Sequence, residues 1–181
     1  MKVLGIDIGG SGIKAAIVNT KNGQLLSERH RIDTPKPATP KAVAKVVKEI
    51  VKHFDWKGAV GCCFPTIIVD GQCKSNGNLS NNWVGVKVDK IFKKKCDGNR
   101  FYVSNDADLA GVAEMSLGAG KGLKGKVIVV TIGTGLGSGL FFNGKLIPNV
   151  ELGRIYHTNG ELIEKFAADS ARKRENLTLN T

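Results

Sequence analysis

The chain has 181 residues, of which 41% are hydrophobic and 24% charged, and its formal net charge is +11 at pH 7. This composition is typical of a globular protein and excludes a disordered chain. No stretch approaches the roughly 20 apolar residues that cross a bilayer, and the amino terminus lacks the apolar core of a signal peptide. We therefore expect a cytoplasmic protein without a membrane partner.

The charge itself favours a polyanionic ligand, because a positive field draws polyanions to a surface. A merely solvated basic surface is the alternative. The lysines are not interleaved with aromatic residues, so we predict no nucleic-acid partner. Cysteines without a C-x-x-C pattern favour reduced core thiols over a metal site. They are Cys62, Cys63, Cys73 and Cys96.

A glycine-rich turn near the amino terminus is the first candidate site. Apolar stretches at 2–8 and 13–19 flank it, which predicts a β-hairpin. Glycine tolerates positive φ and has no Cβ, so such a turn can surround a phosphate with its amide N–H groups. Asp7 precedes the turn, where a cation such as Mg²⁺ would separate its carboxylate from a phosphate. A plain hairpin is the alternative. The turn consists of Gly9, Gly10, Ser11 and Gly12.

The next part of the chain predicts a third strand, a helix and a fourth strand. The third strand is expected at 24–32, and Thr39 and Pro40 then have the pattern of a helix N-cap and first turn. Apolar residues recur at helical spacing as far as Phe54. Residues 59–64 form an apolar run of the kind found in buried parallel strands. The order β-β-β-α-β predicts an α/β domain.

Two further segments contain candidate ligand-binding residues. Residues 71–85 hold too many turn formers for regular structure, and because amide side chains in such loops often bind ligands, Asn78 is a candidate. A surface loop capped by its own asparagines is the alternative. A strand at 100–103 precedes Asn105 and Asp106, where a helix begins. Ligands of open α/β sheets bind at the carboxyl ends of strands, which favours a functional Asp106, with simple helix capping as the alternative.

A second glycine hairpin follows a glycine-rich linker and opens the carboxyl-terminal part of the chain. The hairpin spans 126–142, with Thr134 and Gly135 in its turn. Two hairpins of this type in one chain are hard to obtain by chance, which favours phosphate binding over a plain hairpin. We predict a first domain at 1–122, with the first phosphate motif and Asp106, and the start of a second at 123–181.

Four segments, in this order along the chain, resemble the motifs of the ROK sugar kinases, and among them the polyphosphate glucokinases. They are 7–14 as first phosphate motif, 105–108 as catalytic motif, 133–138 as second phosphate motif and 151–153 as sugar motif. Smaller likenesses extend the match over essentially the whole chain. The resemblance implies an α/β fold of the actin-like, ribonuclease-H-like type, with two domains and a cleft between them.

The resemblance also implies a reaction and the residues for it. Glucose would be phosphorylated at its 6-hydroxyl from polyphosphate, ATP or both, with Asp106 as general base and Asp7 orienting Mg²⁺ through water. Sugar ligands would be Asn105, Asp106 and Glu151, to which we add Asn78. We also expect a homodimer. Donor-binding residues would be Gly9, Gly10, Ser11, Gly12, Lys14, Thr134 and Gly135.

Two departures from the family pattern leave an alternative open. Arg154 stands where family members usually have His. Family members also continue well past the helix that we predict at 160–174, so the carboxyl-terminal part of the second domain is expected to be missing. The alternative is a truncated or non-catalytic ROK-like protein that binds sugar or phosphate without turnover.

The lysine clusters suggest how a long donor could bind. Lysines concentrate at 90–95 and 121–126, before and after Asp106 in the sequence. We predict that folding brings both clusters to one rim of the cleft, where polyphosphate would contact them. An ordinary solvated face is again the alternative.

Overall fold

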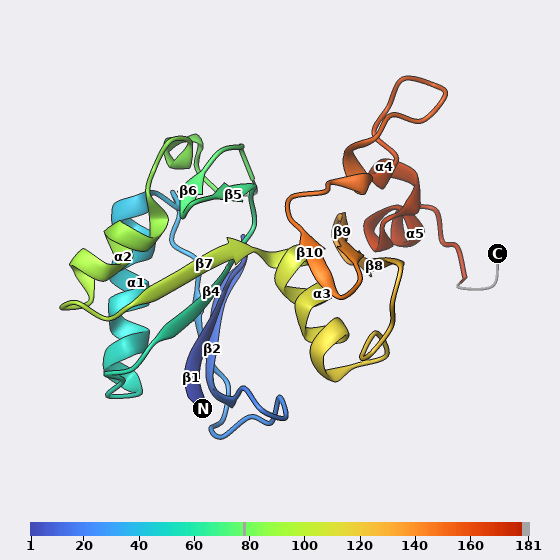
Figure 1. The fold of residues 1–181 in the computed structure, drawn as a ribbon. Coiled ribbons are helices and arrows are strands. Elements are labelled where there is room, and N and C mark those ends of the chain that lie inside the picture. The colour runs from blue at the N-terminus through green and yellow to red at the C-terminus, as the bar shows by residue number, and fades with distance from the viewer. Residues whose placement is uncertain (78, 179–181) are drawn as a thin grey trace. The chain divides into compact units, whose positions relative to one another are not determined.

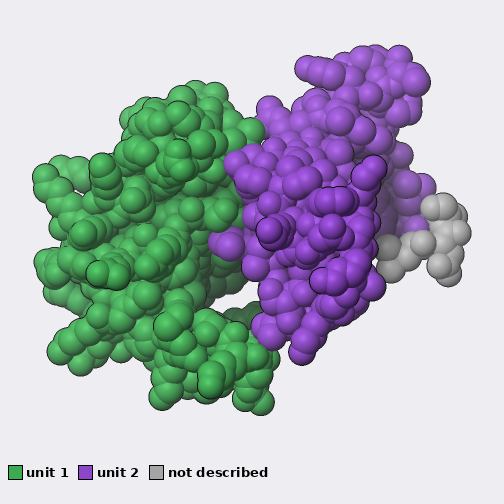
Figure 2. Space-filling view, viewed as in Figure 1, with its two compact units in different colours: residues 1–106 green, residues 107–181 purple. Residues whose placement is uncertain are grey.

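The structure, a computed structural model, describes residues 1–77 and 79–178. It divides into two compact units, unit 1 from Met1 to Asp106 and unit 2 from Ala107 onward (Figures 1 and 2). The sequence predicts a later division, between 122 and 123. The difference arises because α3 (Asp106–Leu117) belongs mostly to unit 2, where Gly111 lies against the Phe141 ring. Independent folding of the two predicted domains stays a prediction.

Unit 1 is built on a five-stranded sheet in the order β3-β2-β1-β4-β7. The first three strands in sequence form an antiparallel meander, and β1, β4 and β7 run parallel, so the predicted order β-β-β-α-β is confirmed. The strands are β1 (Lys2–Ile8), β2 (Gly12–Asn19), β3 (His30–Asp33), β4 (Val60–Phe64) and β7 (Phe101–Asn105).

The predicted third strand is too long. Residues 24–29 leave the ladder because the Ile17 N–H donates to the Ser27 hydroxyl at 2.9 Å, where a strand would offer a backbone carbonyl. The isolated bridge between Val18 and Leu25 interrupts this irregular stretch. β3 is thereby a short edge strand that begins at His30.

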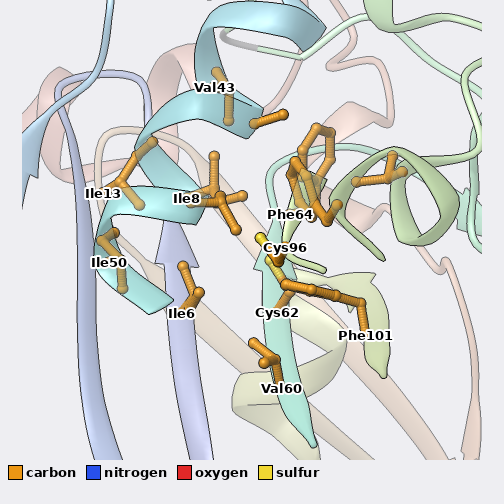
Figure 3. Close-up of a cluster of buried hydrophobic side chains, with 14 of the residues drawn as sticks. Ile6, Ile8, Ile13, Val43, Ile50, Val60, Cys62, Phe64, Cys96 and Phe101 are labelled. Carbon is orange, nitrogen blue, oxygen red and sulfur yellow. The ribbon is translucent and has the colours of Figure 1, made fainter. Parts of the chain in front are cut away.

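Two helices, α1 (Pro40–His53) and α2 (Val88–Lys95), cover one face of this sheet. α1 is the predicted helix, with the Thr39 hydroxyl accepting from the Ala42 N–H at 3.3 Å. Figure 3 shows Ile6 and Ile8 of β1 in the apolar cluster with Val43 and Ile50 of α1. The sequence reading missed α2, which is short and rich in lysine.

The segment 71–85, predicted to lack regular structure, is partly regular. It contains β6 (Gln72–Cys73), paired with β5 (Ile68–Val69), and the 3-10 helix η1 (Asn81–Trp83). Trp83 is 1% exposed, and its indole N–H donates to the Ala38 carbonyl at 2.8 Å. Burial of this large ring holds the loop against the core. Asn78 lies outside the described residues.

Unit 2 contains α3 and a three-stranded antiparallel sheet in the order β10-β9-β8. The predicted hairpin is confirmed, whereas the predicted helix at 160–174 is two short helices separated by Ala168, whose ψ of 159° is extended. Across residues 1–77 and 79–178, no helix is both long and apolar enough to span a bilayer. The remaining elements are β8 (Lys126–Ile132), β9 (Leu136–Phe142), β10 (Lys145–Ile147), η2 (Leu152–Arg154), α4 (Glu164–Ala167) and α5 (Asp169–Arg174).

Candidate active site

A row of polar side chains crosses the face of the unit 1 sheet opposite α1 and α2. Its members are Cα partners in neighbouring strands, so they lie side by side on one face. The residues adjacent to them in each strand, such as Ile6, Ile13 and Cys62, belong to the apolar core on the other face. We call this set the polar row. It consists of Arg31, Lys14, Asp7, Cys63 and Ser104.

Two of the predicted functional carboxylates lie near each other at the carboxyl ends of the parallel strands. Asp7 is the partner of Cys63 across β1 and β4, and Asp106 directly follows β7. Burial, and the nearby carboxylates of Asp7 and then Asp106, raise the pKa of the Cys63 thiol to about 12. The thiol is therefore neutral at physiological pH. Cys63 is half-buried on the polar face, so the prediction of a core thiol is wrong for it.

Hydrogen bonds within unit 1 hold the first glycine turn in place. The Gly9 N–H donates to the Gly12 carbonyl at 3.1 Å, and the Thr34 hydroxyl donates to the Gly9 carbonyl at 2.5 Å. Within residues 1–77 and 79–178, no group accepts a hydrogen bond from the N–H of Gly10 or Ser11. Amide donors without an acceptor are suited to an anion, as the sequence predicts for this turn.

Basic side chains adjoin the turn. Lys14, a predicted donor ligand, has its Nζ 3.8 Å from the Asp7 carboxylate. Arg31 reaches the turn from β3, and its guanidinium donates to the Ser11 carbonyl at 3.1 Å. The sequence reading missed Arg31, because it lies twenty residues further along the chain and belongs to no motif.

Asn105 is buried, with 5% of its surface exposed, and its side-chain amide donates to the Thr66 carbonyl at 3.1 Å. This bond ties the end of β7 to the segment that follows β4, directly before the exposed Asp106. The structure thus gives Asn105 a positioning contact within unit 1. Its role as a sugar ligand stays a prediction.

The second glycine turn, in unit 2, repeats the design of the first. The Gly133 N–H donates to the Gly135 carbonyl at 3.0 Å. The Gly133 carbonyl accepts from the Asp169 N–H at 3.0 Å, and the Thr134 carbonyl accepts from the Ser170 hydroxyl at 2.7 Å. In the part of the chain that the structure describes, the N–H groups of Thr134 and Gly135 have no acceptor. This turn too is suited to an anion.

Glu151 lies in a loop that a single hydroxyl group fastens on both sides. The Ser138 hydroxyl of β9 donates to the Val150 carbonyl at 2.5 Å and accepts from the Leu152 N–H at 2.9 Å. Glu151 then opens η2, which ends at the exposed Arg154. The sequence reading named Glu151 as a candidate but gave Ser138 no role. The position of Ser138 in the second phosphate motif was the signal that could have pointed to it.

Asp108 is a second anchor of this loop. Its carboxylate accepts from the Asn149 N–H at 2.9 Å, and its surface is 0% exposed. Burial raises the pKa of this carboxyl, and the Asn149 hydrogen bond offsets part of that rise. The motif at 105–108 contained Asp108, but the sequence reading gave it no role.

Replacing Asp108 tests this anchor. A carboxyl with a raised pKa binds its proton more tightly in the folded chain, so its contribution to the free energy of unfolding falls as pH rises above its ordinary pKa. Asp108→Asn keeps an acceptor oxygen without the charge, so we expect unchanged or higher stability at pH 7 and a flatter dependence on pH. Asp108→Ala removes the acceptor and should cost about 1–3 kcal/mol. Urea unfolding from pH 4 to 8 measures both, and an Asn variant as unstable as the Ala variant would contradict the prediction.

Lysines 93–95 and Asp106 lie at opposite edges of the unit 1 sheet. These lysines form the last turn of α2, which leads into the start of β7, whereas Asp106 follows the end of that strand (Figure 1). That they share one rim of a cleft with the lysines at 121–126 stays a prediction. A pocket of about 660 Å³ lies at the same edge and is lined by Lys48, Lys52, Trp56 and Arg100 among others. None of the predicted site residues lines it, so we do not assign it to the active site.

This placement changes the expected effect of removing the lysines. The five residues of β7 separate the two edges by roughly 16 Å, beyond the Debye length of about 8 Å at physiological salt. For the two donors that the resemblance implies, polyphosphate and ATP, the combined change of Lys93, Lys94 and Lys95 to Ala should therefore alter the apparent KM by less than about twofold. Steady-state assays with each donor measure this. A selective loss with polyphosphate would show that the chain contacts this edge.

The residues present fit a magnesium ion better than a metal held wholly by protein. The described residues contain no group of three or more His, Cys, Asp or Glu side chains able to hold a metal. Asp7 and Asp106 nevertheless place two hard oxygen donors at one edge of the sheet, beside the unbonded amides of the first turn. Mg²⁺ is commonly held by one or two carboxylates, water and substrate phosphate.

Comparison with known proteins shows the family to which the chain belongs. The family model described as "ROK family" matches residues 3–160. A polyphosphate glucokinase from Mycobacterium tuberculosis is 41% identical over 174 residues, which are 96% of this chain and 65% of that protein. The chain thus spans about two thirds of the length of this relative.

Solved structures match as well. The inorganic polyphosphate/ATP-glucomannokinase from Arthrobacter sp. strain KM is 43% identical with a TM-score of 0.89, over 98% of this chain and 72% of that one. A ROK family glucokinase from Streptomyces griseus, solved with glucose and AMPPNP, is 26% identical with a TM-score of 0.81. The match covers 97% of this chain and 62% of that one. These matches confirm the predicted α/β sugar-kinase fold.

Proposed function

Since this chain belongs to the ROK family, we propose that it phosphorylates the 6-hydroxyl of glucose, using polyphosphate, ATP or both as donor. One observation carries the proposal. Asp106 lies at the carboxyl edge of the unit 1 sheet with Asp7, beside a glycine turn whose Gly10 and Ser11 amides have no acceptor among residues 1–77 and 79–178. A base and an anion-binding turn at one edge are what phosphoryl transfer to a hydroxyl requires.

Asp106 acts as the general base. It is exposed at the start of α3, and an ionised carboxylate there takes the proton of the attacking hydroxyl. Asn105, fixed by its bond to the Thr66 carbonyl, positions the segment that carries this base. The sugar ligands we propose are Asn105, Asp106, Asn78 and Glu151, of which Glu151 is positioned by the Ser138 hydroxyl.

The two glycine turns bind the donor. Amide groups of Gly10 and Ser11 in one turn, and of Thr134 and Gly135 in the other, donate to phosphate oxygens, and Lys14 adds a positive charge. Asp7 would hold Mg²⁺ through water, and the ion would neutralise charge on the donor phosphates. Catalysis of this kind depends on positioning and charge stabilisation more than on covalent chemistry.

A second candidate function is binding of sugar or phosphate without turnover. The observation that favours it is Arg154, which is exposed at the end of η2 where family members usually have His. The anion-binding turns would serve either function. A cytoplasmic location, a homodimer and the absence of membrane and nucleic-acid partners stay predictions.

An assay of the purified chain distinguishes the two functions. Glucose and Mg²⁺ are supplied with ATP or with polyphosphate, and glucose 6-phosphate is measured. We expect turnover with at least one donor. Binding of glucose or tripolyphosphate in calorimetry, without product from either donor, would reject the kinase and support the binding protein.

A further inference from the structure

Arg31 is held against the first glycine turn by specific contacts. Its Nη2 lies 3.1 Å from the Ser11 carbonyl oxygen. A Cβ added to Gly12 would lie 2.7 Å from Arg31 Nε and 2.8 Å from Nη2, so the guanidinium rests on the bare Cα of this glycine. The absence of a side chain at Gly12 therefore makes room for a cation beside the turn.

The charges around Arg31 favour an anion. Arg31 and Lys14 are direct cross-strand partners on the polar row, and like charges in such a pair are destabilising. Their carboxylate neighbours compensate weakly. Asp33 accepts from Arg31 Nη1 at 2.8 Å but its side chain is 82% exposed, and Lys14 Nζ is 3.8 Å from Asp7. A phosphate would replace these exposed contacts with charge-assisted hydrogen bonds.

Sheet geometry decides which phosphate Arg31 can reach. β3 is four strands away from β7 in the sheet, which at about 4.8 Å per strand places the Arg31 backbone roughly 19 Å from the strand that leads to Asp106. The side chain covers part of this distance, and its guanidinium lies at the Ser11 carbonyl of the turn. A phosphate bound there is not the one transferred to the sugar.

We propose that Arg31 binds a distal phosphate of the phosphoryl donor and so selects for a chain of three or more phosphates. The proposal rests on the donor-binding part of the function given above. The amides of Gly10 and Ser11, with Lys14, hold one phosphate, and the guanidinium holds the next ones along the chain. Arginine suits this task because its planar fork binds two phosphate oxygens at once.

The test is calorimetric binding of orthophosphate and tripolyphosphate to the full chain and its variants. Arg31→Gln should weaken tripolyphosphate binding by about 10-fold or more and leave orthophosphate binding unchanged. Arg31→Lys, which keeps the charge but loses the fork, should be intermediate. Arg100→Gln is the matched control, since Arg100 is also exposed in unit 1 but precedes β7 at the opposite edge of the sheet.

A second variant moves the guanidinium without removing its charge. Gly12→Ala should weaken tripolyphosphate binding as Arg31→Gln does, because the added methyl group would lie 2.7 Å from Nε and displace the guanidinium. The substitution should lower the free energy of unfolding only slightly, because the atoms near the added methyl group are at the flexible end of the Arg31 side chain.

The outcomes separate this proposal from the proposed function. Unchanged tripolyphosphate affinity in Arg31→Gln, or an equal loss in Arg100→Gln, overturns the role of Arg31. A wild-type chain that binds no tripolyphosphate overturns the role of Arg31 and the use of polyphosphate as donor, while the glucose 6-phosphate assay with ATP decides the kinase. Wild-type binding with the expected losses, but without turnover, supports Arg31 and rejects only the kinase.

Discussion

Asp106→Asn is expected to lower phosphoryl transfer by about 100-fold or more, with fold and glucose affinity largely retained. An amide has nearly the shape of a carboxylate but cannot accept the proton of the attacking hydroxyl. Because Asp106 is exposed, the exchange buries no unsatisfied group and should hardly change stability. Turnover with each donor and calorimetric glucose binding measure the two parts of the prediction.

Asp97→Asn is the matched control for this experiment. Asp97 is an exposed aspartate of unit 1 that lies at the amino edge of the sheet, and its φ of 55° is well tolerated by asparagine. It should retain normal turnover. If the Asp106 variant kept more than about a tenth of wild-type turnover, Asp106 would not be the base.

Gly153→Ala is expected to destabilise the chain by roughly 3 kcal/mol and to abolish sugar binding by the Glu151 loop. Gly153 is buried in η2, and a Cβ there would overlap the Leu136 carbonyl oxygen. A backbone carbonyl cannot move aside as a flexible side chain can. The strain would displace the loop that the Ser138 hydroxyl holds.

Urea unfolding and glucose binding measure this effect. Gly133→Ala serves as the stability control, because an added Cβ meets nothing within 4 Å there. It should leave the free energy of unfolding nearly unchanged. A Gly153 variant as stable as this control, with normal glucose affinity, would show that the loop tolerates the displacement.

Much of the fold follows from local patterns in the sequence. Both glycine hairpins and α1 were predicted, because strand alternation, turn-forming glycines and helical spacing are read over a few neighbouring residues. The position of Asp106 between a strand and a helix was predicted for the same reason. The errors at β3, α2 and 160–174 concern short elements whose extent depends on contacts elsewhere.

The sequence by itself thus determined which motifs the chain carries and their order, while the tertiary structure decided what holds them. Arg31 donates a hydrogen bond to the Ser11 carbonyl, twenty residues earlier in the chain. Asp108 accepts one from the Asn149 N–H of the Glu151 loop, forty-one residues later. The tertiary structure also places Lys93 and Asp106 at opposite edges of the unit 1 sheet, because β7 runs from one edge to the other. Such contacts depend on strand order and register, which arise from packing the whole core rather than from any local pattern of residues.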